Sequence, residues 1–585
     1  MAASRESAAS QDGWSKWQIG LAVGVPVVVA GGYLLYRRHK NNKKYKCQPP
    51  SGSQKKTSIN NENTNKNLDE FPNKEEKESS PLEKAQAEKN KGNKYFKGGR
   101  YDSAINCYTE AIKLCPVEAE QDLATFYHNR AAAYEKLKNL RMVVEDCTEA
   151  LKHNNKYSKC LMRRAAAAEE LGDLTQALED VTALCILEQF QNPKSLMTAD
   201  RVLKQLGQSK AKETYANRKP TMPSKHFTRT YMKAFTQDPV INRANSLNQS
   251  SVQNGEADIP DTDSPYFEAL KSLNAENYED IIPWCTKELK EDQSSYCLEA
   301  RLMRATFYFL SGDTEKSLAD LKLLMSEDVD KKIRVNALIK RGSILIQQEK
   351  QTDGLDDFAK AVRLDPDNPD VYHHRGHHNI QLDRIDDAIR DLEFAISKCP
   401  AFAASHVQKS FAEHRKLAET IANSGAKLPL PQSLIDSYKN NVTMFPDNGD
   451  ARALYAQALT DAGKFDQADR EFEEAIRLEP DNATAMVHRG LLQLHWKQDV
   501  DEAVKIINQA IDTDDKCEYA YEVLGTLEVQ RSNMERAMEL FQKAIHLSRT
   551  ESEMAHLYSL LDAAHAQLKV AKNLGITIPS MEPQM

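Results

Sequence analysis

Residues 92–116 read GNKYFKGGRYDSAINCYTEAIKLCP, and this stretch decides the fold. A glycine, two alanines and a proline lie at positions 0, 12, 19 and 24 of the stretch. The same spacing recurs at Gly376, Ala388, Ala395 and Pro400, and at Ala456, Ala468, Ala475 and Pro480. Small residues let two helices approach closely, and a proline ends the second helix because it cannot continue the hydrogen-bond ladder. The spacing therefore predicts a repeated helical hairpin.

Incomplete copies of the spacing extend the repeat. They occur at Gly342, Gly354, Ala361 and Pro366, at Gly490, Ala503 and Ala510, and at Gly525, Ala537 and Ala544. This is the 34-residue pattern of tetratricopeptide (TPR) repeats, whose stacked hairpins form a solenoid with a concave inner face. We expect an all-α chain of about ten to eleven helical hairpins in two TPR blocks.

Polar stretches divide the repeats into two domains. The N-terminal block is expected over residues 83–236, with a long helix near its end, and the C-terminal block over residues 265–585. Residues 237–264 are rich in Asn, Ser, Asp and Gln, a composition typical of a flexible linker. The last helix, near residues 552–573, is expected to cap the C-terminal block.

The N-terminus predicts a membrane anchor. Residues 19–36 read IGLAVGVPVVVAGGYLLY and carry no charge, a length that just crosses a bilayer. Six Lys and Arg residues follow between positions 37 and 46, so the positive-inside rule puts everything after the span in the cytosol. We expect residues 1–18 in the intermembrane space, a single-pass helix in the mitochondrial outer membrane, and a disordered tether over residues 37–82. The endoplasmic reticulum is the alternative location.

Composition and missing motifs exclude several function classes. A net charge of −8 argues against nucleic-acid binding, and none of the ten cysteines forms a C-x-x-C pair. Nucleotide-binding and zinc-protease motifs are missing from the sequence, and no stretch outside the repeats could hold a catalytic domain. Residues 371–378, VYHHRGHH, have histidines at metal-ligand spacing but no third ligand nearby, so packing is favoured over a metal. We therefore expect no enzyme activity, no cofactor and no metal.

The N-terminal block carries a cluster of basic and amide residues where the first helix of each hairpin should face inward. Its members are Lys89, Asn93, Asn129, Lys159 and Arg163. Residues four apart share a helix face, so three cations and two amides would line one groove and bind an acidic peptide end. The set resembles the carboxylate clamp of TPR co-chaperones. That resemblance implies binding to the Glu-Glu-Val-Asp tails of the seventy- and ninety-kilodalton heat-shock chaperones.

The whole chain resembles the large TPR receptors of the mitochondrial outer-membrane translocase. The resemblance rests on residues 90–116, on RATFY at 304–308, on ALYAQALTD at 453–461 and on MAHLYSLLDAAHAQ at 554–567. It implies a receptor for chaperone-bound precursors whose C-terminal block binds internal targeting signals of hydrophobic preproteins such as carrier proteins. It also implies transfer to other translocase subunits. The concave wall of that block should include Asp450, Gln457, His488, Leu491, Glu522 and Thr526.

Two other functions are compatible with TPR repeats. One is an enzyme that uses the repeats for targeting, which would need a catalytic domain that this sequence has no room for. The other is a co-chaperone anchored in the endoplasmic reticulum, without a precursor site of its own.

Overall fold

The computed structural model describes residues 80–253, 264–291, 295–424 and 430–576. Over these ranges the chain is helical, from α3 to α28, with one short 3₁₀ turn and no strand, so the all-α prediction is confirmed. The expected anchor at 19–36 lies outside the described residues. None of the helices that the structure describes is long and apolar enough to cross a membrane.

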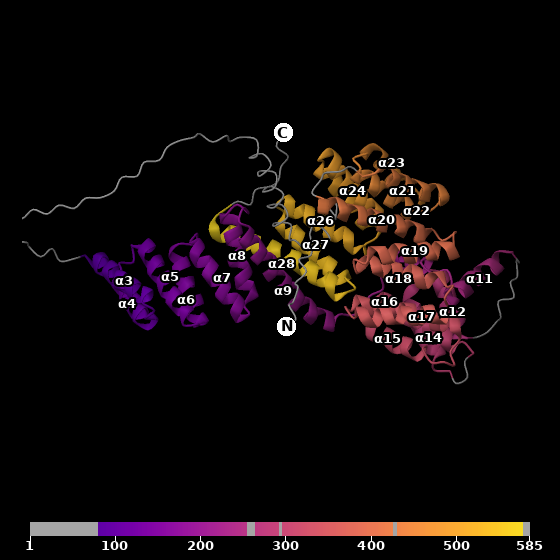
Figure 1. Ribbon diagram of the computed structural model, residues 1–585, viewed down its shortest axis with the longest axis horizontal. Coiled ribbons are helices and arrows are strands. Elements are labelled where there is room, and N and C mark those ends of the chain that lie inside the picture. Colours follow the sequence, from indigo (N-terminus) through magenta and orange to yellow (C-terminus); the bar gives the residue numbers. More distant parts are fainter. Residues whose placement is uncertain (1–79, 254–263, 292–294, 425–429, 577–585) are drawn as a thin grey trace, which may run out of the picture. The chain divides into compact units, whose positions relative to one another are not determined.

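The described residues form two compact units. The N-terminal unit comprises residues 80–207 and 562–576, and the C-terminal unit comprises residues 208–561. Figure 1 shows α3 to α8 of the N-terminal unit following one another in chain order, each beside the next.

Six helices in three hairpins begin the N-terminal unit, and the first part of a long helix follows them. They are α3 (Pro81–Lys97), α4 (Tyr101–Leu114), α5 (Glu120–Lys136), α6 (Leu140–His153), α7 (Ser158–Leu171), α8 (Leu174–Leu187) and α9 (Pro193–Asn217). The small residues of the repeat lie where the helices meet. A Cβ atom at Gly92 would lie 2.7 Å from the Tyr108 ring, and Ala104 and Ala111 are fully buried.

The C-terminal unit contains the remaining hairpins, and its helices follow in chain order. They are α10 (Lys225–Lys233), α11 (Pro239–Gln253), α12 (Pro265–Asn274), η1 (Tyr278–Asp280), α13 (Ile281–Glu288), α14 (Cys297–Ser311), α15 (Thr314–Leu323), α16 (Lys331–Gln347), α17 (Gln351–Leu364), α18 (Pro369–Gln381), α19 (Ile385–Lys398), α20 (Ala403–Ser424), α21 (Gln432–Met444), α22 (Gly449–Asp461), α23 (Phe465–Leu478), α24 (Ala483–Lys497), α25 (Val500–Thr513), α26 (Glu518–Gln530) and α27 (Met534–Leu547).

An ion pair recurs within the hairpins. An arginine on the first helix binds an aspartate 16 residues later on the second helix through two hydrogen bonds of 2.6–2.9 Å. The pairs are Arg130–Asp146, Arg164–Asp180, Arg304–Asp320, Arg341–Asp357 and Arg375–Asp391. The aspartates are buried. Two-pronged charge-assisted bonds of this kind fix the relative orientation of the two side chains and also add stability. The pair therefore sets how these five hairpins close.

Helix α11 corrects one expectation. It occupies Pro239–Gln253, within the stretch whose composition predicts a flexible linker. Asp238 caps this helix by accepting hydrogen bonds from the amides of Val240 and Ile241. Val240 and Ala244 are buried in a hydrophobic cluster of the C-terminal unit, and this packing holds a polar segment in a helix.

The last helix also differs from its expected role. Helix α28 (Glu551–Leu574) was expected to cap the C-terminal block, yet its residues from 562 onward belong to the N-terminal unit. Val570 and Leu574 share a buried cluster with Leu184, and Lys569 Nζ lies 2.5 Å from Glu179 Oε1. The end of α28 thus completes the core of the second and third hairpins.

We expect Leu574→Ala to destabilise the N-terminal unit by about 2–4 kcal/mol, because a buried leucine leaves a cavity when it is shortened. Hydrogen exchange at the amides of α8 should accelerate accordingly. Lys572→Ala is the matched control, since Lys572 lies two residues earlier on the same helix and is exposed. Unchanged α8 exchange in Leu574→Ala would contradict the packing described here.

Candidate functional site

The five residues expected to form the carboxylate clamp lie on the first helices of three successive hairpins. Lys89 and Asn93 lie on α3, Asn129 on α5, and Lys159 and Arg163 on α7. Lys159 is exposed and the other four are partly exposed, so all five remain accessible to a ligand. Each pair on α3 and α7 is four residues apart and shares one helix face.

On both α5 and α7, one arginine is bound inside its hairpin, and the residue directly before it is accessible. Arg130 and Arg164 turn toward the second helix of their hairpins and bind buried aspartates. The adjacent Asn129 and Arg163 are therefore directed away from those pairs. The tyrosine hydroxyl of Tyr108 donates a hydrogen bond of 2.8 Å to Asn93 Oδ1, which fixes that amide.

The partners of Arg163 are the best defined among the five residues. Its Nε donates to Glu135 Oε2 at 2.9 Å, and its Nη1 lies 2.9 Å from the Nε2 atom of His128. His128 is only 8% exposed and packs against Tyr157. Burial, together with the charges of Arg163 and Lys159, lowers the pKa of His128 to about 4. The imidazole is thus neutral near pH 7 and can support a cationic neighbour.

Helices α5 and α7 therefore bring Lys159 and Arg163 close to His128, the residue directly before Asn129. His128 and Glu135 belong to the same site, although the sequence did not single them out. The position of His128 directly before Asn129 was the only available signal, and a histidine there is compatible with simple packing. Chemically, this arrangement offers guanidinium and ammonium donors to an anion that can displace Glu135.

A second concave site lies in the C-terminal unit. It is a pocket of about 750 Å³ lined by residues of α10, α22, α24 and α26, among other segments. Four of the six residues expected on this wall line it, namely Asp450, Gln457, His488 and Glu522. Leu491 instead lines a small adjoining recess with Gln457 and His488, and Thr526 lines neither.

The pocket is acidic with apolar walls. Its carboxylates are Asp450, Glu479, Asp514, Glu518, Glu522 and Glu553, and its lysines and arginines are Lys233, Lys516 and Arg549. Burial and the charges of Glu553 and Glu522 raise the pKa of Glu518 to about 8. Burial lowers the pKa of His488 to about 4, and His556 lies 3.0 Å from Glu522. The apolar part of the wall includes Phe227, Phe402, Val407, Leu454 and Leu547. Such a pocket suits a ligand with both cationic and apolar groups.

The histidines of residues 371–378 face neighbouring side chains on α18 and α20. His373 Nδ1 lies 3.0 Å from Ser405 Oγ, and His377 Nδ1 lies 3.1 Å from the amide nitrogen of Gln408. His374 packs on Phe235, with ring centres 4.2 Å apart. Burial lowers the pKa of His373 to about 3, so this ring is neutral and packs within the repeat.

Comparisons with known proteins agree with this architecture. A family model described as a TPR repeat matches residues 92–138, and one described as a tetratricopeptide repeat matches residues 454–514. The mitochondrial import receptor subunit TOM70 of Rattus norvegicus is 45% identical over 97% of this chain and 93% of its own length. The chain belongs to the TOM70 family.

The Homo sapiens TOM70 is 44% identical over 97% of this chain and 94% of its own length. The crystal structure of the yeast Tom70 is 24% identical, covers 84% of this chain and 99% of its own, and superposes with a TM-score of 0.46. Family membership makes the chain a mitochondrial import receptor subunit built of TPR repeats, as the sequence predicted.

Proposed function

We propose that this TOM70 family member docks chaperone-bound precursors through the clamp on α3, α5 and α7, and binds internal targeting signals in its acidic pocket. The partners are the Glu-Glu-Val-Asp tails of seventy- and ninety-kilodalton heat-shock chaperones, and hydrophobic preproteins such as carrier proteins. Residues 19–36 anchor the receptor in the mitochondrial outer membrane, with the repeats in the cytosol. The receptor works without a catalytic step or cofactor and passes precursors to other translocase subunits.

The geometry of Arg163 is the observation that carries the clamp. Its guanidinium is partly buried between a neutral histidine and a single carboxylate, and Lys159 lies on the same face one helical turn earlier. An arginine fork matches a carboxylate in shape and charge. The two carboxylates of a peptide ending in aspartate would therefore replace Glu135 as the partner of Arg163. Glu135 is 44% exposed and can turn into solvent when it is displaced.

The acidic pocket carries the second part of the proposal. Internal targeting signals with helical segments present cations on one side and apolar side chains on the other. Carboxylates beside an apolar wall would bind both kinds of group, in the manner of an amphipathic helix in a groove. The pocket also lies within the C-terminal unit, so it needs no part of the clamp to form.

Glu135→Gln tests the clamp directly. It removes the acid that competes for Arg163, so a tail peptide ending in Glu-Glu-Val-Asp should bind roughly 2–5-fold more tightly, as expected for a half-exposed ion pair of about 0.5–1 kcal/mol. Titration calorimetry with the full-length receptor in detergent measures this change. Glu149→Gln, which removes an exposed acid from the second helix of the hairpin, should leave the affinity unchanged. Weaker or unaltered binding in Glu135→Gln would refute the proposed role of Arg163.

A further inference from the structure

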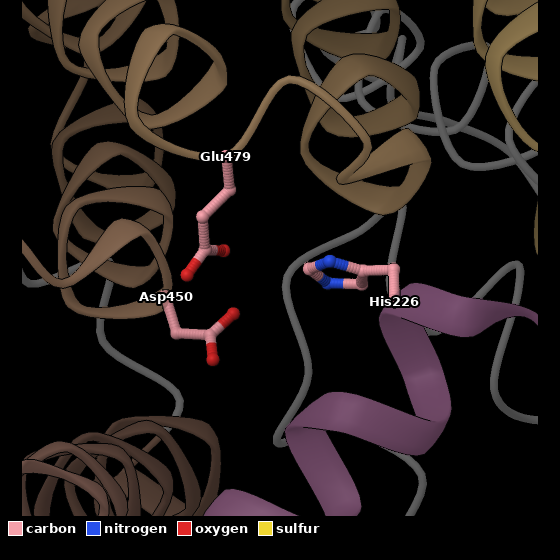
Figure 2. A group of neighbouring side chains, drawn as sticks. All are labelled: His226, Asp450 and Glu479. Carbon is pink, nitrogen blue, oxygen red and sulfur yellow. The ribbon is translucent and has the colours of Figure 1, made fainter. Parts of the chain in front are cut away.

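Three side chains from three separate segments meet in the acidic pocket. They are His226 near the start of α10, Asp450 in the first turn of α22, and Glu479 directly after α23. One nitrogen or oxygen atom from each side chain lies within 4.8 Å of those from the other two. Figure 2 shows the imidazole and both carboxylates turned toward the same space. All three residues are partly buried.

The two carboxylates lie together, and the charges of His226 and Lys233 and a hydrogen bond from Asn482 act on Asp450. Among the described residues, neither Asp450 nor Glu479 forms an ion pair with a lysine or arginine, although Arg229 binds the nearby Asp481 at 2.6 Å. Asn482 donates one hydrogen bond of 3.1 Å to Glu479 Oε2. Burial, followed by the charge of Glu479, raises the pKa of Asp450. Two adjacent carboxylates in a partly buried pocket repel each other, and a bound cation would remove that repulsion.

The backbone leaves room for this arrangement. A Cβ atom at position 449 would lie 2.7 Å from Cδ and Oε2 of Glu479, so this carboxylate rests directly against the backbone at the start of α22. A larger residue at position 449 would require the Glu479 carboxylate to shift.

A further carboxylate, that of Asp481, lies beside the imidazole of His226. Its Nδ1 lies 3.5 Å from Asp481 Oδ1, and Arg229 holds Asp481 in place. An Nδ1–H directed at Asp481 leaves the lone pair of Nε2 available to a metal. Metal-binding histidines commonly have this second carboxylate, which fixes the ring and its tautomer.

One imidazole nitrogen and two carboxylate oxygens are ligands that Zn²⁺ and related divalent ions accept. Because each bond would be about 2.0–2.2 Å, ligand atoms around such an ion lie roughly 3–3.5 Å apart. The ligand atoms of the three side chains, which lie within 4.8 Å of one another, would move closer together to reach that spacing. Three protein ligands also leave a position for water or for a ligand of the pocket.

We propose that His226, Asp450 and Glu479 bind one divalent transition-metal ion of the zinc class. The ion would neutralise the carboxylate pair and join α10 to the hairpin formed by α22 and α23. It would also occupy the acidic part of the pocket that otherwise attracts cations. The metal site follows from these three side chains alone and does not depend on the proposed binding of targeting signals.

The test uses the full-length protein in detergent after removal of metals with a chelator. Co²⁺ is added while its visible absorption is recorded, and Zn²⁺ is titrated by calorimetry. We expect one ion per chain with a nitrogen and oxygen spectrum. The variants His226→Gln, Asp450→Asn and Glu479→Gln should each weaken binding by about 10–100-fold or more. Circular dichroism should show unchanged helix in all three variants, which separates lost ligands from lost folding.

Two matched controls separate this site from its surroundings. Glu518→Gln removes an acid that lines the same pocket but lies outside the cluster, and it should leave the affinity unchanged. Cys517→Ser removes a thiol that also lines the pocket, and it too should have no effect. The proposal is overturned if neither ion binds. It is equally overturned if Co²⁺ gives a thiolate charge-transfer band that disappears in Cys517→Ser, or if the three ligand variants bind as the native protein does.

Discussion

Arg163→Ala should weaken binding of a Glu-Glu-Val-Asp peptide by roughly 30–150-fold, the equivalent of about 2–3 kcal/mol for a lost charge-assisted pair. Alanine supplies neither the charge nor the two donors of the guanidinium. His128 stays neutral and buried, so it cannot take over the positive charge. The remaining binding should be less sensitive to salt, because one ionic contact is missing.

Fluorescence anisotropy with a labelled tail peptide measures this loss at several salt concentrations. Arg141→Ala is the control, since it removes an exposed arginine from the second helix of the middle hairpin. Helical circular dichroism should be native-like in both variants. Arg163→Ala binding within about twofold of native would rule out Arg163 as a clamp residue, because such a change is only about 0.4 kcal/mol.

Lys340→Met should destabilise the C-terminal unit by about 3–5 kcal/mol, because it leaves the buried Asp238 without its counter-charge. Lys340 Nζ lies 2.6 Å from Asp238 Oδ2, and the two side chains are 2% and 1% exposed. The Lys340 ammonium also lies over the Phe235 ring, 4.9 Å from its centre. Denaturant unfolding followed by the fluorescence of Trp284, which packs on the same hydrophobic cluster as α11, measures the effect.

Two further variants test the cause of that destabilisation. Lys331→Met on the same helix breaks an exposed pair with Asp365 and should cost less than about 1 kcal/mol. The double variant Lys340→Met with Asp238→Asn should recover part of the loss, since the buried carboxylate is gone while an amide oxygen still caps α11. A double variant less stable than Lys340→Met would contradict the charge argument.

The repeat geometry could be predicted because the repeated hairpins need small residues at the same point, where their two helices touch. Gly92 and Gly525 lie against Tyr108 and Phe541 at the same point of their hairpins, so the spacing of small residues carried the fold. The Arg–Asp pairs lie in the same frame at a constant separation of 16 residues, but the spacing of small residues does not reveal them. A polar pair at fixed spacing is as informative as an apolar one when the structure repeats.

Helix α11 and the end of α28 were harder to predict, for different reasons. Helix α11 has an N-cap aspartate followed by a proline, which is a recognised signal for the start of a helix. The polar composition of the whole stretch predicted a linker instead. Helix α28 reads correctly as a helix, but sequence periodicity cannot say which unit its apolar side chains join. Val570 and Leu574 contact residues almost 400 positions earlier, and a single sequence holds no record of such a contact.

The acidic pocket of the C-terminal unit could likewise be predicted only in part. The expected wall residues Asp450, Gln457 and Glu522 lie on the first helices of their hairpins, α22 and α26, and the repeat frame put them in one pocket. His226 comes from a segment outside the repeat frame, more than 200 residues before its neighbours Asp450 and Glu479. Thr526, one turn from Glu522, lines no part of the pocket. The frame gives the position of a residue along the helix, whereas packing decides which surface it reaches.

We infer that one receptor has two separate binding sites. A paired binding assay with a chaperone-tail peptide and a carrier-derived signal peptide on Arg163→Ala and Glu522→Lys tests this directly. We expect Arg163→Ala to lose only the chaperone tail. Glu522→Lys should lose only the signal peptide, because it places a cation on the acidic wall. If both variants lose the same ligand, a single continuous groove serves both partners and the two-site account is wrong.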